Sequence, residues 1–447
     1  MTDPRASSAP APSWGLGKGA ELLPETLAAV ERGRREGLHL GAQLYASLGA
    51  RPVADLAVGA AAPDGMPLTP DHLVLWLSSS KPVAAVAIAQ LWERGLLALD
   101  DPVARHWPEF AQGGKERVTV RHLLTHTAGI RMLDTGWPDA PWDEIVGRIA
   151  ARRLEPRWVP GEKAGYHLAS SWFVLGELVR RLDGRPFSRY VREEVFEPLG
   201  MADSWIGMPA ERYRAYREAG RLAPMFDTAI RQGGGEGGGE RGERKLRPHA
   251  WDAEPRVVNP SPGGNGWGPV RELGRLYEAL LGGGAPPPAM GSTASAAASA
   301  AELARGRVLG PQTVEALAAR HRAGMHDHTF DHVLDWGLGV IVDSKQYGVE
   351  TVPYAYGRLC SRRTFGHSGY RSSTGFTDPA HGLVVALAFN GTPEAEAHER
   401  RIRDVLDALY RDLELSGEAT GMPGGEEGTE SAGGRAAEAV EGPGDAP

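Results

Sequence analysis

LWLSSSKPVAAVAI, residues 75–88, places Ser78 and Lys81 three positions apart at the start of an apolar run. The run is apolar nearly all round, which predicts a buried helix that ends near Gly95. Residues three apart share a helix face, so the Lys81 amine can reach the Ser78 hydroxyl and activate it as a nucleophile. The free N–H groups and the positive dipole end at a helix N-terminus would stabilise an oxyanion and would favour the neutral form of a nearby lysine. Because Ser78 could equally cap the helix beside a solvated lysine, the choice depends on the remaining sequence.

The composition is that of a soluble globular protein, with 41% apolar and 24% charged residues. The net charge of −8, without a basic stripe, argues against nucleic acid as the main partner. Cys360 is the single cysteine, so no internal disulfide framework is possible. The first ten residues lack an apolar leader, and no run is long enough to span a bilayer. We therefore expect a cytoplasmic protein that makes no membrane contact.

The distribution of small and polar residues predicts how the chain is divided. Residues 1–20 are rich in Ala, Pro, Ser and Gly and are expected to form a flexible arm. Residues 21–415 are expected to form one folded unit. Low-complexity insertions interrupt it at about residues 232–250 and 282–301. The Gly- and Glu-rich residues 416–447 are expected to be a disordered tail.

Apolar periodicity predicts a mixture of helices and strands. Helices are expected over residues 24–36, 78–95, 174–182, 187–196, 270–281, 314–319 and 402–413. Strands are expected over residues 40–48, 53–58, 336–342, 374–377 and 383–389. Short turns join consecutive strands, so these pairs must be antiparallel. The predicted fold class is therefore α+β.

Two further stretches carry residues able to do acid–base chemistry. His122 and His126 lie four apart on a short helix that we expect to end at Gly129. They are expected to bind backbone groups and fix a turn rather than to react. Tyr166 follows a Pro160-Gly161 turn and precedes a helix. It is either a surface aromatic residue or, beside a lysine, a general base that then acts as general acid.

Five short motifs follow one another in a distinctive order. They are SSSK at residues 78–81, LLTHTAGI at 123–130, PGEKAGY at 160–166, EPLGM at 197–201 and GHSG at 366–369. This order resembles that of the serine β-lactamase-related proteins, the class C β-lactamase-like hydrolases that include carboxylesterases and D-amino-acid peptidases. The resemblance spans residues 20–415. It implies a penicillin-binding-protein-like fold, an antiparallel β-sheet flanked by helices plus a mostly helical domain, with the site in the cleft between them.

The resemblance also implies a catalytic set. Ser78 matches the nucleophile, Lys81 the amine that helps to activate it, and Tyr166 the tyrosine that carries the proton to the leaving group. The reaction would be acyl transfer through an acyl-enzyme that water then hydrolyses. No cofactor and no metal are implied. The expected partner is a small-molecule ester or amide, and the oligomeric state is left open.

The motif His367-Ser368-Gly369 lies where the family has Lys-Thr-Gly or His-Thr-Gly. The N–H groups of Ser78 and Tyr370 would then form the oxyanion hole. Two departures from the β-lactamase pattern affect the substrate. His167-Leu168 follow Tyr166 where the family has x-Asn, and His367 is largely neutral at physiological pH. We therefore expect a carboxylesterase for small neutral esters, with a β-lactamase or a D-amino-acid peptidase or amidase as the alternative.

Three other interpretations compete with this one. Gly366-His367-Ser368-Gly369-Tyr370, followed by Asp378 and His381, approaches the nucleophile elbow of α/β-hydrolases. The final glycine is missing, however, and a hairpin follows instead of a helix. The residues 326–332, HDHTFDH, could supply metal ligands but fit a solvated, His-rich loop better. A non-catalytic scaffold of the same fold is the third interpretation, although it would have no need of Ser78, Lys81 and Tyr166.

Overall fold

The computed structural model describes residues 17–230, 244–287, 307–353 and 356–415. The expected N-terminal arm up to residue 16, the tail and most of both insertions lie outside the described residues. Residues 244–250, at the end of the first insertion, are described and include strand β6 (Arg247–Pro248), which pairs with β5 (Phe226–Asp227).

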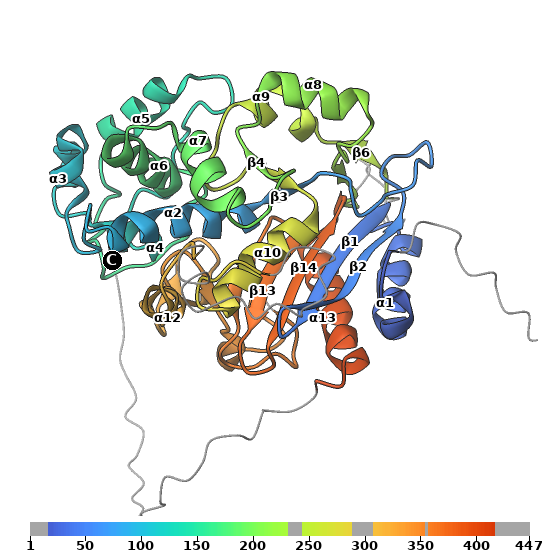
Figure 1. The fold of residues 1–447 in the computed structure, drawn as a ribbon. Helices are drawn as coiled ribbons and strands as arrows, with labels where there is room; N and C mark the ends of the chain where they lie inside the picture. The colour runs from blue at the N-terminus through green and yellow to red at the C-terminus, as the bar shows by residue number, and fades with distance from the viewer. Residues whose placement is uncertain (1–16, 231–243, 288–306, 354–355, 416–447) are drawn as a thin grey trace, which may run out of the picture.

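The molecule is built on a seven-stranded sheet with the order β10-β11-β12-β13-β14-β1-β2 (Figure 1). Every neighbouring pair in it is antiparallel, as expected. Its strands are β1 (Gly41–Leu48), β2 (Arg51–Gly59), β10 (Asp335–Trp336), β11 (Ile341–Val342), β12 (Phe365–Ser368), β13 (Ser373–Asp378) and β14 (Leu383–Phe389). Strand β1, the strand nearest the N-terminus, pairs with β14, which lies close to the C-terminal helix in the sequence. The N-terminal and C-terminal parts of the described chain therefore share this sheet.

Helices cover both faces of this sheet. The helices of the described residues are α1 (Pro24–Arg35), α2 (Lys81–Glu93), α3 (Val103–His106), α4 (Val120–Leu124), α5 (Trp142–Ala151), α6 (Ser170–Asp183), α7 (Phe187–Val191), α8 (Ala210–Glu218), α9 (Glu254–Val258), α10 (Val270–Leu281), α12 (Pro311–Ala318) and α13 (Ala395–Asp412). Alternate residues of β14 point to opposite faces. Val385 and Leu387 share a core with α1 and α13, whereas Val384 and Ala386 share the other core with α10 and α2.

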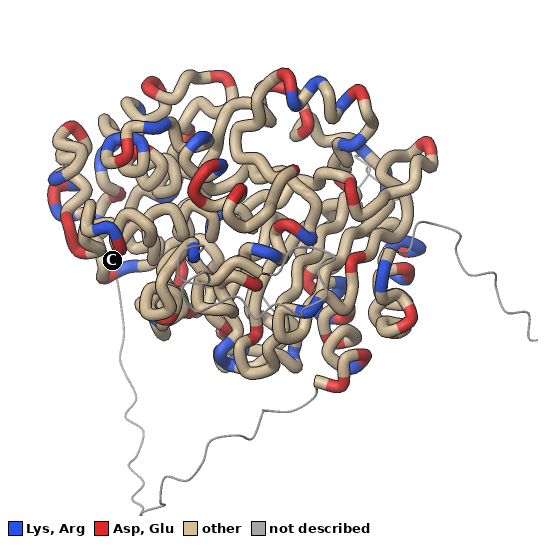
Figure 2. Tube along the Cα trace, viewed as in Figure 1, with Lys and Arg blue, Asp and Glu red and all other residues tan. Residues whose placement is uncertain are grey.

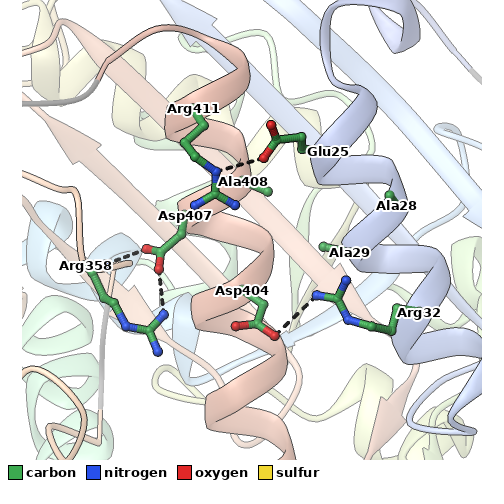
Figure 3. Close-up of a pocket in the computed structure, with 9 residues that line it drawn as sticks. All are labelled: Glu25, Ala28, Ala29, Arg32, Arg358, Asp404, Asp407, Ala408 and Arg411. Atoms are coloured by element: carbon green, nitrogen blue, oxygen red, sulfur yellow. Dashed lines mark hydrogen bonds and ion pairs between the residues drawn. The ribbon is translucent and has the colours of Figure 1, made fainter.

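Ion pairs hold the outer helices α1 and α13 together (Figure 3). Glu25 pairs with Arg411 at 2.8 Å, and Arg32 pairs with Asp404 at 3.3 Å. The hollow between the two helices is therefore lined by charges that already have partners. We assign it a structural role.

A mostly helical region, from α2 to α9, lies against one end of the sheet (Figure 1). Short strands connect the two parts: β3 (Val74–Leu77), β7 (Gly266–Gly268) and β4 (Trp205–Ile206) form one small sheet, and β15 (Gly391–Thr392), β5 and β6 form another. A separate hairpin consists of β8 (His326–Asp327) and β9 (His332–Val333). The architecture is α+β, as the sequence predicts.

Three predicted elements differ from the structure for reasons that the contacts explain. The single strand expected over 336–342 is a hairpin of β10 and β11, because Gly337 donates to the Val340 carbonyl at 2.9 Å and Gly339 adopts φ 79°. The helix with His122 ends at Leu124, before His126 at φ 58°. Helix α13 begins at Ala395 rather than near residue 402, since its first turns bury polar side chains such as His398 that carry no apolar signal.

The charged residues of the described surface are intermixed. Lys and Arg alternate with Asp and Glu along the visible helices (Figure 2). Across the described part of the chain, no helix combines the length and the apolar composition needed to cross a bilayer.

Candidate active site

Ser78 lies at the junction between strand β3 and helix α2. Leu77, the last residue of the strand, adopts φ 50° and ψ −133°, a conformation that an L-residue rarely takes. The Ser373 hydroxyl fixes the neighbouring backbone by donating to the Trp76 carbonyl at 2.6 Å. A 3₁₀ turn, Ser78–Ser80, then leads into the helix. Ser78 is partly exposed, whereas Ser79 and Ser80 are buried. Of the three serines, Ser78 is therefore the one that remains accessible to solvent at this strained junction.

Lys81 is fully buried beneath Ser78. Its Nζ lies 2.9 Å from Ser78 Oγ, 3.1 Å from the Leu168 carbonyl and 2.7 Å from the Gly263 carbonyl. Burial lowers the pKa of Lys81 well below its usual value. A neutral amine has two N–H donors and one lone pair. In the neutral form, the two carbonyls accept both N–H groups, and the lone pair is left to accept the Ser78 hydroxyl proton, as a general base requires.

Tyr166 packs beside this pair in an aromatic enclosure. Its ring centroid lies 5.0 Å from Lys81 Nζ, 4.7 Å from the His126 ring and 4.8 Å from the Phe330 ring. The tyrosine side chain is buried. The structure thus brings Tyr166 beside Ser78 and Lys81, which come from a different segment of the sequence.

Asp327 positions the backbone of Tyr166, and sequence reasoning did not assign it this role. Its Oδ1 accepts the Tyr166 N–H at 3.0 Å, and its Oδ2 pairs with the Arg322 guanidinium at 2.9 Å. Both side chains of the ion pair are buried, and burial lowers the pKa of Arg322 to about 10. Asp327 belongs to the His-rich stretch that the sequence offered as metal ligands. It instead joins the loop before Tyr166 to the β8–β9 hairpin.

His126 and His167 form a buried, neutral pair behind Tyr166. The His167 N–H donates to His126 Nδ1 at 2.9 Å, and His167 Nε2 accepts the Ile130 N–H at 3.1 Å. Burial, more than any neighbouring charge, lowers both pKa values, that of His167 to about 3. Both rings accept backbone N–H groups and shape the site. His126 does so as the sequence predicts, and His122, its partner in that prediction, accepts the Thr119 N–H at 3.2 Å.

The GHSG motif lies at the end of β12, against the Ser78 junction. His367 is fully buried, with Nδ1 2.8 Å from the Ser368 carbonyl, and burial followed by the proximity of Lys81 lowers its pKa well below the usual range. A Cβ on Gly369 would lie 2.5 Å from the Trp76 carbonyl oxygen, so only glycine permits this approach. Tyr370 follows directly and is half exposed.

The nucleophile-elbow interpretation of residues 366–370 does not hold. Ser368 lies within an antiparallel strand and pairs with Thr374, at one end of β13. Asp378 and His381 bind each other at 2.8 Å, at the opposite end of β13. The three residues therefore cannot form a catalytic triad.

The His-rich stretch shows no clustered ligands. His326 pairs with Asp331 at 3.1 Å on the exposed tip of the hairpin. His332 lies 3.0 Å from the Thr351 hydroxyl. Within the described residues, no three His, Cys, Asp or Glu side chains converge to hold a metal ion.

A serine paired with a buried lysine, between an antiparallel sheet and a helical region, defines the class of the protein. It is a serine hydrolase with the fold of the penicillin-recognising enzymes. The model of the Beta-lactamase family matches residues 27–410, and the chain belongs to that family.

Relatives and solved structures agree with this assignment. Esterase/beta-lactamase LipL of Mycobacterium tuberculosis is 27% identical over 393 residues, which cover 81% of this chain and 79% of LipL. Esterase EstB of Burkholderia gladioli is 28% identical over 376 residues, covering 77% of this chain and 84% of EstB. The structure of a family VIII carboxylesterase covers 89% of this chain and 99% of its own, at 25% identity and a TM-score of 0.67. A penicillin-binding protein homologue from Caulobacter crescentus covers the same shares, at 28% identity and a TM-score of 0.66.

Proposed function

We propose that this protein is a carboxylesterase that cleaves small esters through an acyl-enzyme on Ser78. The observation that carries the proposal is the buried Lys81 amine, 2.9 Å from Ser78 Oγ and with no carboxylate among its three bonding partners. A charged ammonium would not remain in such a place without a counter-ion. Lys81 is therefore a neutral base in contact with the nucleophile.

The reaction then has two halves. Lys81 takes the Ser78 proton while Oγ attacks the ester carbonyl, and the N–H groups of Ser78 and Tyr370 stabilise the oxyanion. The bond to the alcohol oxygen breaks, and Tyr166 delivers the proton to that oxygen. The Tyr166 phenolate then takes a proton from water, whose oxygen attacks the acyl carbon. As the bond from the acyl carbon to Ser78 Oγ breaks, Lys81 returns its proton to Oγ, and the carboxylic acid leaves with all three side chains in their starting forms.

The residues around Ser78 favour an ester over a β-lactam or a peptide. The neutral His367 replaces a permanently charged lysine of the family pattern, and Leu168 replaces the asparagine amide. Two relatives are named esterases, and a similar structure is a carboxylesterase. β-Lactamase activity is the second candidate. It is favoured by the name of LipL and by a β-lactamase of Escherichia coli that is 30% identical over 154 residues.

The test is the Ser78→Ala variant with 4-nitrophenyl butyrate. We expect hydrolysis to be lost while the thermal unfolding midpoint stays within a few degrees of the parent. Turnover that survives the substitution would contradict the proposal. A fluorophosphonate probe should label the parent protein and not the variant, whereas a non-catalytic scaffold would leave both unlabelled. Nitrocefin, assayed alongside, measures β-lactamase activity directly.

We further propose that residues 21–415 act as one catalytic unit and that the protein works in the cytoplasm. The first part is supported by the family match over residues 27–410. The second is supported by the single cysteine, Cys360, which is buried and unpaired. Fractionation of cells that express the tagged full chain tests the location.

A further inference from the structure

Two buried serine hydroxyls lie between the turn that carries Ser78 and the first residue of strand β13. Ser79 Oγ lies 3.0 Å from Ser373 Oγ, and Ser373 Oγ donates to the Trp76 carbonyl at 2.6 Å. Both serine side chains are fully buried. Neither hydroxyl takes part in the proposed reaction, so their arrangement beside the nucleophile needs another explanation.

The chemistry of a hydroxyl fixes the direction of this chain of hydrogen bonds. A serine hydroxyl has one proton to donate and two lone pairs that accept. Ser373 donates its proton to the Trp76 carbonyl, so in the contact between the two serines Ser79 donates and Ser373 accepts. The His367 carbonyl, 3.2 Å from Ser79 Oγ, shares the Ser79 proton. The chain therefore runs from Ser79 to Ser373 to the Trp76 carbonyl, and each bond polarises the next.

Ser373 thereby holds the nucleophile turn on both sides of Ser78. Trp76 lies two residues before Ser78, and Ser79 follows it directly. Between them, Leu77 has the strained φ of 50°. The pairing of β3 with β7 changes register at this point, so the strand ladder alone does not hold it. A strained conformation persists only where the surrounding contacts over-determine it, and the Ser373 hydroxyl makes two such contacts.

The same residue also fixes the segment that carries the second proposed oxyanion donor. The Ser373 carbonyl accepts the Gly369 N–H at 2.8 Å, across the turn that joins β12 to β13. A Cβ on Gly369 would lie 2.3 Å from Ser373 Oγ, so the two residues are in close contact. Tyr370 follows Gly369 directly. Ser373 is therefore bonded to both segments whose separation sets the distance between the Ser78 and Tyr370 N–H groups.

We propose that Ser373 and Ser79 are positioning residues that set the spacing between the two N–H groups of the oxyanion hole. The inference rests on the proposed esterase function and adds two residues to it. Both hydroxyls act through the backbone, by holding the two N–H groups at hydrogen-bond distance from the developing oxyanion. Because the negative charge on that oxygen develops only during the attack, a changed spacing should lower kcat and leave KM nearly unchanged.

Alanine substitutions of two adjacent serines test the proposal. Ser373→Ala removes the hydroxyl that binds the nucleophile turn. Ser372→Ala is the matched control, because the Ser372 side chain is also fully buried and its hydroxyl donates to the Phe389 carbonyl of β14 at 2.7 Å rather than to the nucleophile turn. Each variant loses a buried hydrogen bond to a main-chain carbonyl, so the unfolding midpoints of both should fall. Values of kcat and KM are measured with 4-nitrophenyl butyrate.

We expect Ser373→Ala to lower kcat about ten- to a hundredfold with little change in KM, because misplaced oxyanion donors cost a factor of this order. Ser372→Ala should keep kcat within about threefold of the parent, since its lost bond affects stability rather than the hole. Equal values of kcat for the two variants would overturn the inference.

Butylboronic acid gives a second readout that a loss of stability alone would not change. Its boron binds the nucleophilic serine oxygen to form a tetrahedral anion that resembles the transition state and occupies the oxyanion hole. The Ki should therefore rise in Ser373→Ala together with the loss of kcat/KM and stay unchanged in Ser372→Ala. A parent-like Ki in Ser373→Ala would contradict the assignment.

A double-mutant cycle tests the part of Ser79. If the two hydroxyls form one chain, Ser79→Ala and Ser373→Ala remove the same link, and the double variant should lose less kcat than the product of the single losses. Ser79→Ala combined with Ser372→Ala should lose the product. Multiplicative losses in the first pair would overturn the assignment of Ser79.

Two further results keep the test decisive. If Ser373→Ala does not fold, Ser373→Cys replaces it, because a thiol fills the space but donates only weakly. A lowered kcat with an unchanged KM then supports the inference, and a parent-like kcat overturns it. A parent without Ser78-dependent hydrolysis would refute the proposed function and this inference with it. Ser78-dependent hydrolysis with equal kcat in Ser372→Ala and Ser373→Ala refutes only the inference.

Discussion

Replacing Asp327 with alanine should damage stability and catalysis together. Asp327 is fully buried, and its carboxylate accepts from Arg322 at 2.9 Å, from the Tyr166 N–H at 3.0 Å and from the Thr329 N–H at 2.9 Å. Alanine would leave the buried Arg322 guanidinium without a counter-ion, which costs about 3–5 kcal/mol. Asn in place of Asp keeps the shape and one acceptor oxygen, so its loss should be intermediate.

The expected decrease is measured by urea unfolding, with kcat/KM for 4-nitrophenyl butyrate as the second readout. Because the Tyr166 backbone would lose its anchor, kcat/KM of Asp327→Ala should fall by at least about tenfold. Asp331→Ala is the matched control, since Asp331 lies four residues away in the same hairpin and is 95% exposed. Its cost should stay at about 1 kcal/mol or less, because alanine tolerates the φ of 53° at this position less well than aspartate but loses no buried contact. Equal unfolding free energies for the two alanine variants would refute this assignment of Asp327.

Three other predictions concern the residues around Ser78. Tyr166→Phe should lower kcat by roughly 10²–10⁴ with little change in the unfolding midpoint, and a rate within threefold of the parent would contradict its role as proton carrier. Burial lowers the pKa of Lys81 below its ordinary 10.5. At a pH between the pKa of the folded chain and that of the unfolded chain, the unfolded chain holds one proton more. The free energy of unfolding therefore rises with pH in this range, by up to about 1.4 kcal/mol per pH unit. Lys81→Met should remove this rise in urea titrations from pH 7 to 10, and an unchanged slope would show that Lys81 is charged. Gly369→Ala should lower kcat/KM at least tenfold, because its Cβ would lie 2.5 Å from the Trp76 carbonyl and displace the end of β12; a parent-like rate would mean that this contact relaxes freely.

The order of the motifs predicts much of the fold and the central residues of the site. The hairpin of β1 and β2, helix α10 and the β13–β14 pair follow from local periodicity, which depends only on neighbouring residues. Ser78 and Lys81 are also predictable, because their spacing on one turn is a local property. That Tyr166 lies beside them could be predicted only from the resemblance to the family.

Contacts between distant segments could not be predicted. Asp327 and Tyr166 are 161 positions apart, and no spacing rule links them. In the sequence, Asp327 looked like one of several metal ligands because burial, which decides its partner, is a property of the fold.

The conformation of Leu77 has a consequence for engineering. At φ 50° and ψ −133°, the residue costs the folded chain about 1–3 kcal/mol, and glycine would adopt the same angles without that cost. A library selected only for heat resistance should therefore enrich Leu77→Gly, and the looser peptide would let the Ser78 hydroxyl drift from the Lys81 lone pair. The substitution would therefore raise the unfolding temperature and lower the turnover rate, so a selection that measures both properties would reject it.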